Sequence, residues 1–158
     1  MKKNRITFLK SVVVVIGLII LALCIFVLPA AANYFAEIGP EFAYLKYPVL
    51  IGIYITTIPF YFALGQALKL LNMIIRNPFT ESAKISLKRI KVSAVIIGLL
   101  YVFGILFLNT QGGALNPGVG LLGILIAAAS FVIAVFTSVI QELVGRMIDI
   151  KAENDLVI

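Results

Sequence analysis

Fifty consecutive residues without a charged side chain, from Val92 to Gln141, constrain this chain more than any other feature. A helix needs about 20 apolar residues to cross the hydrocarbon of a bilayer. The run is therefore too long for one membrane span and has the right length for two spans joined by a turn. We place these spans at about residues 92–108 and 118–140.

The turn between these two spans is predicted at residues 109–117. Gly112 and Gly113 break regular structure there. Asn116 followed by Pro117 can start the next helix, because Asn accepts hydrogen bonds from the first free N–H groups and Pro at the next position wastes no donor.

Two more apolar runs lie earlier in the chain, at about residues 11–32 and 47–68. Charged residues make up 13% of the chain and hydrophobic residues 62%, whereas charged residues are about a quarter of a soluble domain. We therefore predict an all-α integral membrane protein, a four-helix bundle formed by one domain over residues 1–158.

The first run has an alternative interpretation as a secretory signal peptide, since residues 30–32 are small and a basic segment precedes the run. The apolar core of a signal peptide is only about 7 to 15 residues long, which favours a membrane span. Pro29 is expected to break or end this helix because it lacks an N–H group. Residues 33–46 are predicted to be a short external connection whose aromatic rings lie at the headgroup level.

The basic residues predict the orientation, because Lys and Arg in short loops favour the cytoplasmic side. If both termini are cytoplasmic, only Lys46 of the 13 Lys and Arg residues lies outside. We therefore expect the segment 76–91 to be cytoplasmic together with both termini. The net charge of +6 then reflects topology and not direct binding of nucleic acid.

Two amphipathic cytoplasmic segments are predicted, at about residues 78–91 and 141–152. The first is expected to start with Asn77 as its cap, and its lysines recur every three or four residues. The simplest interpretation is that these charges hold the loop inside and meet anionic lipid headgroups. In the second segment, Glu142 and Arg146 are spaced to form a pair.

The same basic segment, with the acidic end of the chain, is our candidate surface for a soluble partner. The two elements have opposite charge, and we expect them to lie together at the inner face of the membrane. The candidate docking residues are Asn77, Pro78, Phe79, Lys84, Lys88, Arg89, Lys91, Glu153, Asn154 and Asp155.

Pro59 lies in the middle of the second span, where it frees the carbonyl group of Ile55 and predicts a kink. The hydroxyl groups of Thr56 and Thr57 can help to satisfy the backbone nearby. A kink occurs in transporters and switches, but packing alone also accounts for a proline at this place.

The residues that carry most catalysis are scarce. The chain has no His, one Cys and seven Asp or Glu residues, so the usual general bases and zinc ligands are missing. We predict no catalytic, cofactor-binding or metal-binding residues and no enzymatic activity. The predicted spans also contain no Asp, Glu, Lys or Arg, which are the residues that mark proton and ion pathways.

The chain resembles a bacterial membrane family called domain of unknown function 2975. The resemblance rests on the Asn-Pro-Phe-Thr sequence at 77–80, which leads into a Lys-Arg-Ile run, and on the Glu-Asn-Asp-Leu-Val-Ile sequence at 153–158. It implies a small four-span protein of the bacterial plasma membrane, in a family often encoded beside a small helix-turn-helix repressor.

We therefore expect a regulatory or sensing membrane protein that engages a soluble partner such as that repressor. A small transporter or an immunity-type membrane protein is the alternative, and the lipid bilayer is a partner in either case. A homo-oligomer is also left open by the sequence.

Overall fold

The computed structural model describes residues 2–77, 79–113 and 115–157. Its elements are α1 (Lys2–Ala22), a π-helix η1 (Leu23–Val27), α2 (Leu28–Ile38), a 3-10 helix η2 (Pro40–Leu45), α3 (Lys46–Arg76), α4 (Glu81–Asn109) and α5 (Pro117–Val157). Because α1, η1 and α2 follow one another without a break, the described chain forms four long helical rods, each apolar and long enough to span a membrane. The all-α, four-span fold class is thus confirmed.

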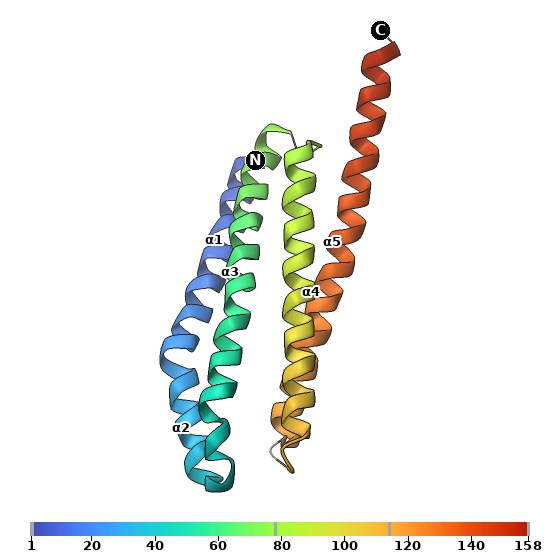
Figure 1. Cartoon of the computed structure of the whole chain (residues 1–158). Coiled ribbons are helices and arrows are strands. Elements are labelled where there is room, and N and C mark those ends of the chain that lie inside the picture. Colours follow the sequence, from blue (N-terminus) through green and yellow to red (C-terminus); the bar gives the residue numbers. More distant parts are fainter. Residues whose placement is uncertain (1, 78, 114, 158) are drawn as a thin grey trace.

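The four rods form an open row in chain order (Figure 1). α3 packs against α1 and α2 on one side and against α4 on the other, and α5 packs against α4. Within the described residues no extensive contact joins α1 to α4 or α5. Both ends of the chain and the α3–α4 connection lie at the same end of the rods, at the top of Figure 1, and η2 and the α4–α5 turn lie at the opposite end. We call these the two ends of the row.

Small side chains line the contact between α4 and α5. The buried positions of α5 recur every three or four residues up to Thr137 and again seven residues later, which puts them on one face of the helix. They are Gly120, Gly123, Ala127, Ser130, Ala134, Thr137 and Val144. The neighbouring Ala128 and Ala129 are exposed. Small residues let two backbones approach closely, which favours association of helices in lipid.

Two glycines receive large side chains from the opposite helix. A Cβ atom on Gly98 would lie only 2.8 Å from Cζ of Phe131, and one on Gly123 would lie 2.8 Å from Cδ1 of Ile105. These contacts also fix the antiparallel register of α4 and α5. The aromatic ring of Phe131 has less freedom to move away than the end of the Ile105 side chain.

The first rod does not end at Pro29, contrary to the sequence prediction. It passes through the π-helix η1, in which the N–H of Leu28 bonds to the carbonyl of Leu23. Pro29 cannot continue this pattern to the Cys24 carbonyl because it has no N–H. The hydroxyl of Tyr54 donates to that carbonyl instead, at 2.6 Å, so a side chain from α3 satisfies the backbone group.

Replacing Tyr54 by Phe is expected to weaken the contact between α1 and α3 by about 1 kcal/mol, because it leaves the Cys24 carbonyl unpaired in an apolar environment. Cys24 is the sole cysteine and is buried. The rate at which a thiol-reactive dye labels it on heating therefore measures the loss of this contact. Tyr34→Phe, which alters an exposed ring, is the control and should leave the labelling curve unchanged.

The predicted external connection at residues 33–46 is largely helical. α2 extends to Ile38, and η2 occupies most of the remainder. The hydroxyl of Tyr44 donates to Oε1 of Gln111 at 2.7 Å. This hydrogen bond ties η2 to the α4–α5 turn, in which Gly112 and Gly113 have positive φ angles of 61° and 101°.

The two predicted Asn-Pro helix starts have different outcomes. Asn116 does cap α5, because its Oδ1 accepts from the N–H of Val119 at 2.8 Å. Asn77 does not cap α4: its Oδ1 accepts from the N–H of Phe79, and α4 begins three residues later than expected. Thr80 is the cap, with its hydroxyl accepting from the N–H of Ala83 at 3.2 Å, and Glu81 follows in the first turn, where negative charge is favourable.

Candidate functional site

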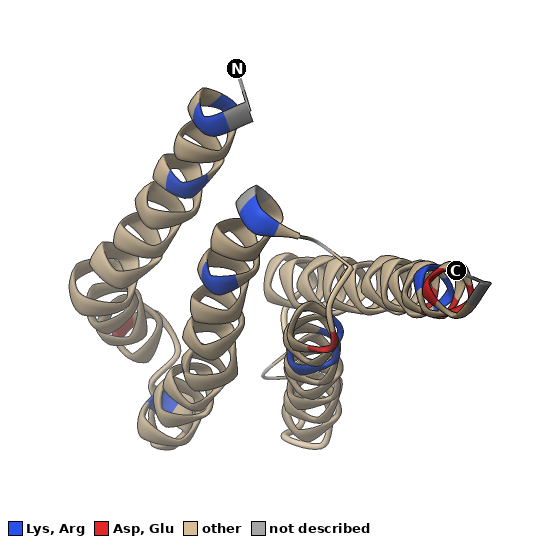
Figure 2. Cartoon of the chain, turned by 90° about the horizontal axis from the view of Figure 1, so that it is seen from above, with Lys and Arg blue, Asp and Glu red and all other residues tan. Residues whose placement is uncertain are grey.

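The basic end of the row carries the predicted docking residues. Figure 2, seen from above, shows Lys and Arg near this end of α1, α3 and α4 and at the far end of α5, where acidic residues also lie. α4 runs as one helix from Glu81 through the predicted amphipathic segment into its span. The side chains of this segment therefore point in directions set by one continuous helical repeat.

The basic side chains of α4 lie on two different parts of the helix surface, one beside α5 and one beside the groove between α3 and α4. Lys84 points toward α5, since its Nζ lies 3.4 Å from the position of a Cβ atom on Gly145. Lys88 and Arg89 line a groove between α3 and α4. Lys91 is partly buried and does not line this groove. The sequence predicted one basic surface, whereas the helix divides it between two.

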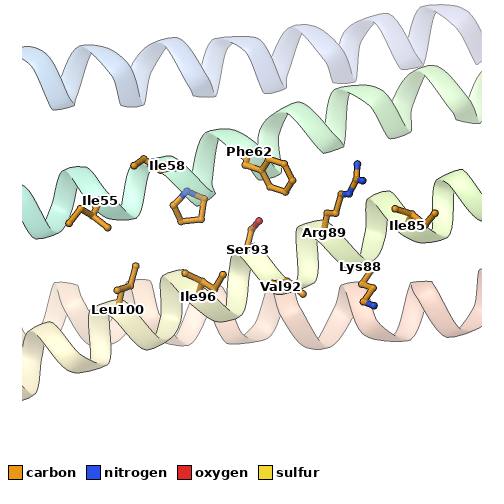
Figure 3. A pocket seen from close by; sticks show the side chains of 11 residues that line it. Ile55, Ile58, Phe62, Ile85, Lys88, Arg89, Val92, Ser93, Ile96 and Leu100 are labelled. Atoms are coloured by element: carbon orange, nitrogen blue, oxygen red, sulfur yellow. The ribbon is translucent and has the colours of Figure 1, made fainter.

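The groove has a volume of about 720 Å³. Its walls are apolar apart from the two basic residues at one end and one hydroxyl (Figure 3). α3 contributes Ile55, Ile58, Pro59 and Phe62, and α4 contributes Ile85, Lys88, Arg89, Val92, Ser93, Ile96 and Leu100. Most of the large apolar side chains in this set are exposed, so the groove is open along its length.

No carboxylate among the described residues pairs with Lys88 or Arg89. The ion pair that the described part of the chain contains joins Arg146 to Glu142 at 3.0 Å, as their spacing predicted. Lys88 and Arg89 are both exposed. Figure 3 shows that the Arg89 side chain points toward α3 and the Lys88 side chain points away from it. Within the described residues, two positive charges thus stand without a counter-charge at this end of the groove.

The acidic tail does not lie beside these two cations. Lys84 is level with Gly145, and at 1.5 Å per residue Glu153 lies about 12 Å farther along α5, beyond the first turn of α4. Lys88 and Arg89 lie on the other side of that level, which separates them from Glu153 by about 18 to 20 Å along the axis. Glu153, Asn154 and Asp155 are exposed on the free end of α5.

The α3–α4 connection contains the rest of the predicted docking residues. Asn77 ends α3, and its N–H bonds to the carbonyl of Met73. Phe79 is exposed, and Pro78 lies outside the described residues. Asn77 and Phe79 lie at the same end of the helical rods as the tail, but within the described chain no hydrogen bond joins the connection to the tail.

Pro59 lies inside α3, which is helical from Lys46 to Arg76. The hydroxyls of Thr56 and Thr57 each donate to a carbonyl three residues earlier, at 2.6 Å, and so do not bond to the Ile55 carbonyl that the proline frees. The kink stays a prediction. What the structure adds is that Pro59 forms part of the groove wall.

The groove was not predicted from the sequence, although the sequence contains a signal for it. Its α3 residues recur at helical spacing, and so do those of α4, and the short connection between the two helices makes them neighbours. Gln66 also lies in α3, and its Oε1 is buried and has no hydrogen-bond partner among the described residues.

Together these features define a four-span helical membrane protein with an apolar groove and a long free helix at its basic end. In the described residues no group of three His, Cys, Asp or Glu side chains could hold a metal ion.

The chain belongs to the family described as "Protein of unknown function (DUF2975)", whose sequence profile matches residues 30–158. It is 47% identical over 161 residues to the "Uncharacterized membrane protein YoaS" of Bacillus subtilis (strain 168), with both chains covered completely. No solved structure matches it.

Proposed function

We propose that this chain is a regulatory membrane protein that holds a soluble protein at the cytoplasmic surface. The observation that supports this role most strongly is the free end of α5. The helix continues beyond the first turn of α4 and ends at Val157. A membrane anchor alone does not need this extension.

The free end of α5 has the surface of a helix that pairs with another helix. Leu143, Met147 and Ile150 lie on one face at helical spacing and are 55%, 45% and 56% exposed. Glu142, Arg146, Asp149 and Glu153 form a charged stripe beside them. Apolar anchors at this spacing, with charges along the edge, suit a helix that lies in the groove of a partner.

The candidate partner is a small helix-turn-helix repressor, and this identification rests on the family resemblance described above. Holding such a regulator at the membrane would control transcription without contact between this chain and DNA. A change in the packing of the four rods would alter how the free end is presented, provided that the signal binds one arrangement better than another.

Replacing Ile150 by Glu is expected to reduce capture of the partner at least tenfold, because a charge in the centre of an apolar contact must lose its water without a counter-charge. The measurement is co-purification of the repressor, expressed with the full-length membrane protein and quantified against it. Ala152→Glu is the matched control, since it adds the same charge to an exposed position on another face of the same helix.

Equal capture by the wild type and both variants would contradict the proposal. So would equal loss in both variants, because any added charge would then act as well as one in the apolar stripe. Transport of a solute by the purified protein in reconstituted vesicles would favour the alternative of a small transporter.

A further inference from the structure

The groove between α3 and α4 suggests a ligand that is apolar over most of its length and negatively charged at one end. From these properties we infer that it binds one acyl chain of an anionic phospholipid, with the lipid phosphate at Lys88 and Arg89. This site does not depend on the proposed soluble partner. It depends on the groove, its charges and its position in the membrane.

The length of the groove matches one leaflet. Its α4 wall runs from Ile85 to Leu100, which is about 22 Å at 1.5 Å per residue. Half of a bilayer with its headgroups is about 20 to 23 Å thick. A lipid whose phosphate is level with Lys88 therefore has its acyl chain beside the apolar wall formed by Ile58, Phe62 and Ile96.

The charges select the headgroup. Arg89 and Lys88 present guanidinium and ammonium donors, which bind phosphate oxygens strongly. Both lack a carboxylate partner among the described residues. Basic pockets between membrane helices are typical sites for anionic lipid headgroups. A zwitterionic lipid offers the same phosphate together with a positive group that these two residues repel.

The open row makes the groove accessible from the bilayer. Neither α1 nor α5 is placed between α3 and α4 in the contacts of the described chain, and the side chains of Ile58, Phe62 and Val92 are exposed. A second apolar helix in the groove would leave Lys88 and Arg89 without a counter-charge. An anionic lipid supplies both the apolar chain and the charge.

The experiment uses the absence of Trp from the sequence. Phe62→Trp places a single Trp in the groove, and Phe136→Trp places one on an exposed site of α5 that the helix registers put at about the same depth. Excitation at the red edge of the Trp band avoids the six Tyr residues. Each full-length protein is reconstituted in phosphatidylcholine vesicles with a minor fraction of phosphatidylglycerol. The acyl chains of one or the other lipid are brominated, so that a neighbouring lipid quenches the fluorescence.

Brominated phosphatidylglycerol is expected to quench the groove reporter several times more than the α5 reporter at the same mole fraction. Lys88→Gln with Arg89→Gln should abolish this preference, since each basic residue near anionic lipid contributes roughly a fivefold factor in affinity and the two together roughly 25-fold. Lys84→Gln is the matched control, because it removes a charge of the same helix that faces α5. It should leave the preference unchanged.

Three results would overturn the inference. Equal quenching of both reporters by phosphatidylglycerol would show that the groove has no preference for this lipid. An unchanged preference in the Lys88 and Arg89 double variant would show that these residues do not bind the headgroup. Protection of the groove reporter from both brominated lipids would show that protein, such as a second copy of the chain, covers the groove.

Discussion

Replacing Gly98 by Leu is expected to separate α4 from α5 and to lower the stability of their contact by about 2 kcal/mol or more. The ring of Phe131 lies where the new side chain would begin, with Cζ and Cε1 only 2.8 and 2.9 Å from a Cβ atom. Inserting carbons into a packed contact forces side chains and backbone to shift, which typically costs about 1 to 3 kcal/mol. Neither helix can bend away easily, because small residues hold them close over most of the span.

The measurement is the accessibility of the α4–α5 contact on heating. Ser130 is buried in this contact, and Ser130→Cys in a Cys24→Ser protein provides a thiol that reacts with a dye only when the helices part. Gly104→Leu is the matched control, since a Cβ atom on Gly104 meets nothing within 4 Å. It should leave the transition temperature nearly unchanged.

A second variant separates the contact from a general effect of Leu on the helix. Phe131→Ala removes the ring, so adding it to Gly98→Leu should restore part of the lost stability. If Gly98→Leu and Gly104→Leu shift the transition equally, the close approach of Gly98 and Phe131 does not stabilise the protein.

Thiol labelling of intact cells is expected to give an all-or-none difference between the two ends of the row. Ser82 and Thr110 are exposed at opposite ends, and the charge bias puts Ser82 in the cytoplasm. In a Cys24→Ser protein, an impermeant thiol reagent should therefore label Thr110→Cys and not Ser82→Cys. Both should react after the cells are opened, which controls for reactivity.

If only Ser82→Cys were labelled in intact cells, the protein would have the opposite orientation in the membrane. The free end of α5 would then be outside, and a cytosolic partner could not reach it. The lipid site would survive this result, because it would be located in the opposite leaflet with the same charges and walls.

The sequence was sufficient for the four apolar rods because each rod depends on composition over about 20 residues. It was less reliable at the ends of helices, because single hydrogen bonds determine at which residue a helix begins or ends. Thr80, and not Asn77, caps α4, and a hydroxyl from α3 allows the first rod to continue through Pro29. The second case depends on Tyr54, which is 30 residues from Cys24, so a local reading could not foresee it.

The residues of the candidate site were partly predicted from the sequence, but the structure places them on two separate surfaces. The basic residues of α4 were found from their spacing, but which of them face α5 and which face α3 depends on the order of the rods. Lys84 and Arg89 are five residues apart, which is enough to turn them to different neighbours. The separation of the tail from the groove came from the length of α5, since the sequence placed the end of its amphipathic segment near residue 152.

The length of α5 also makes it a lever. It has 41 residues, about 60 Å at the rise of an α-helix, and its close contacts with α4 extend from Gly123 to Gly145. Beyond Gly145, which is level with Lys84, the arm to Asp155 is about 15 Å long, so a bend of about 30° at that contact moves the tip by about 8 Å. A bend at the last contact with α4 thus displaces the tip by about the distance between the axes of two packed helices.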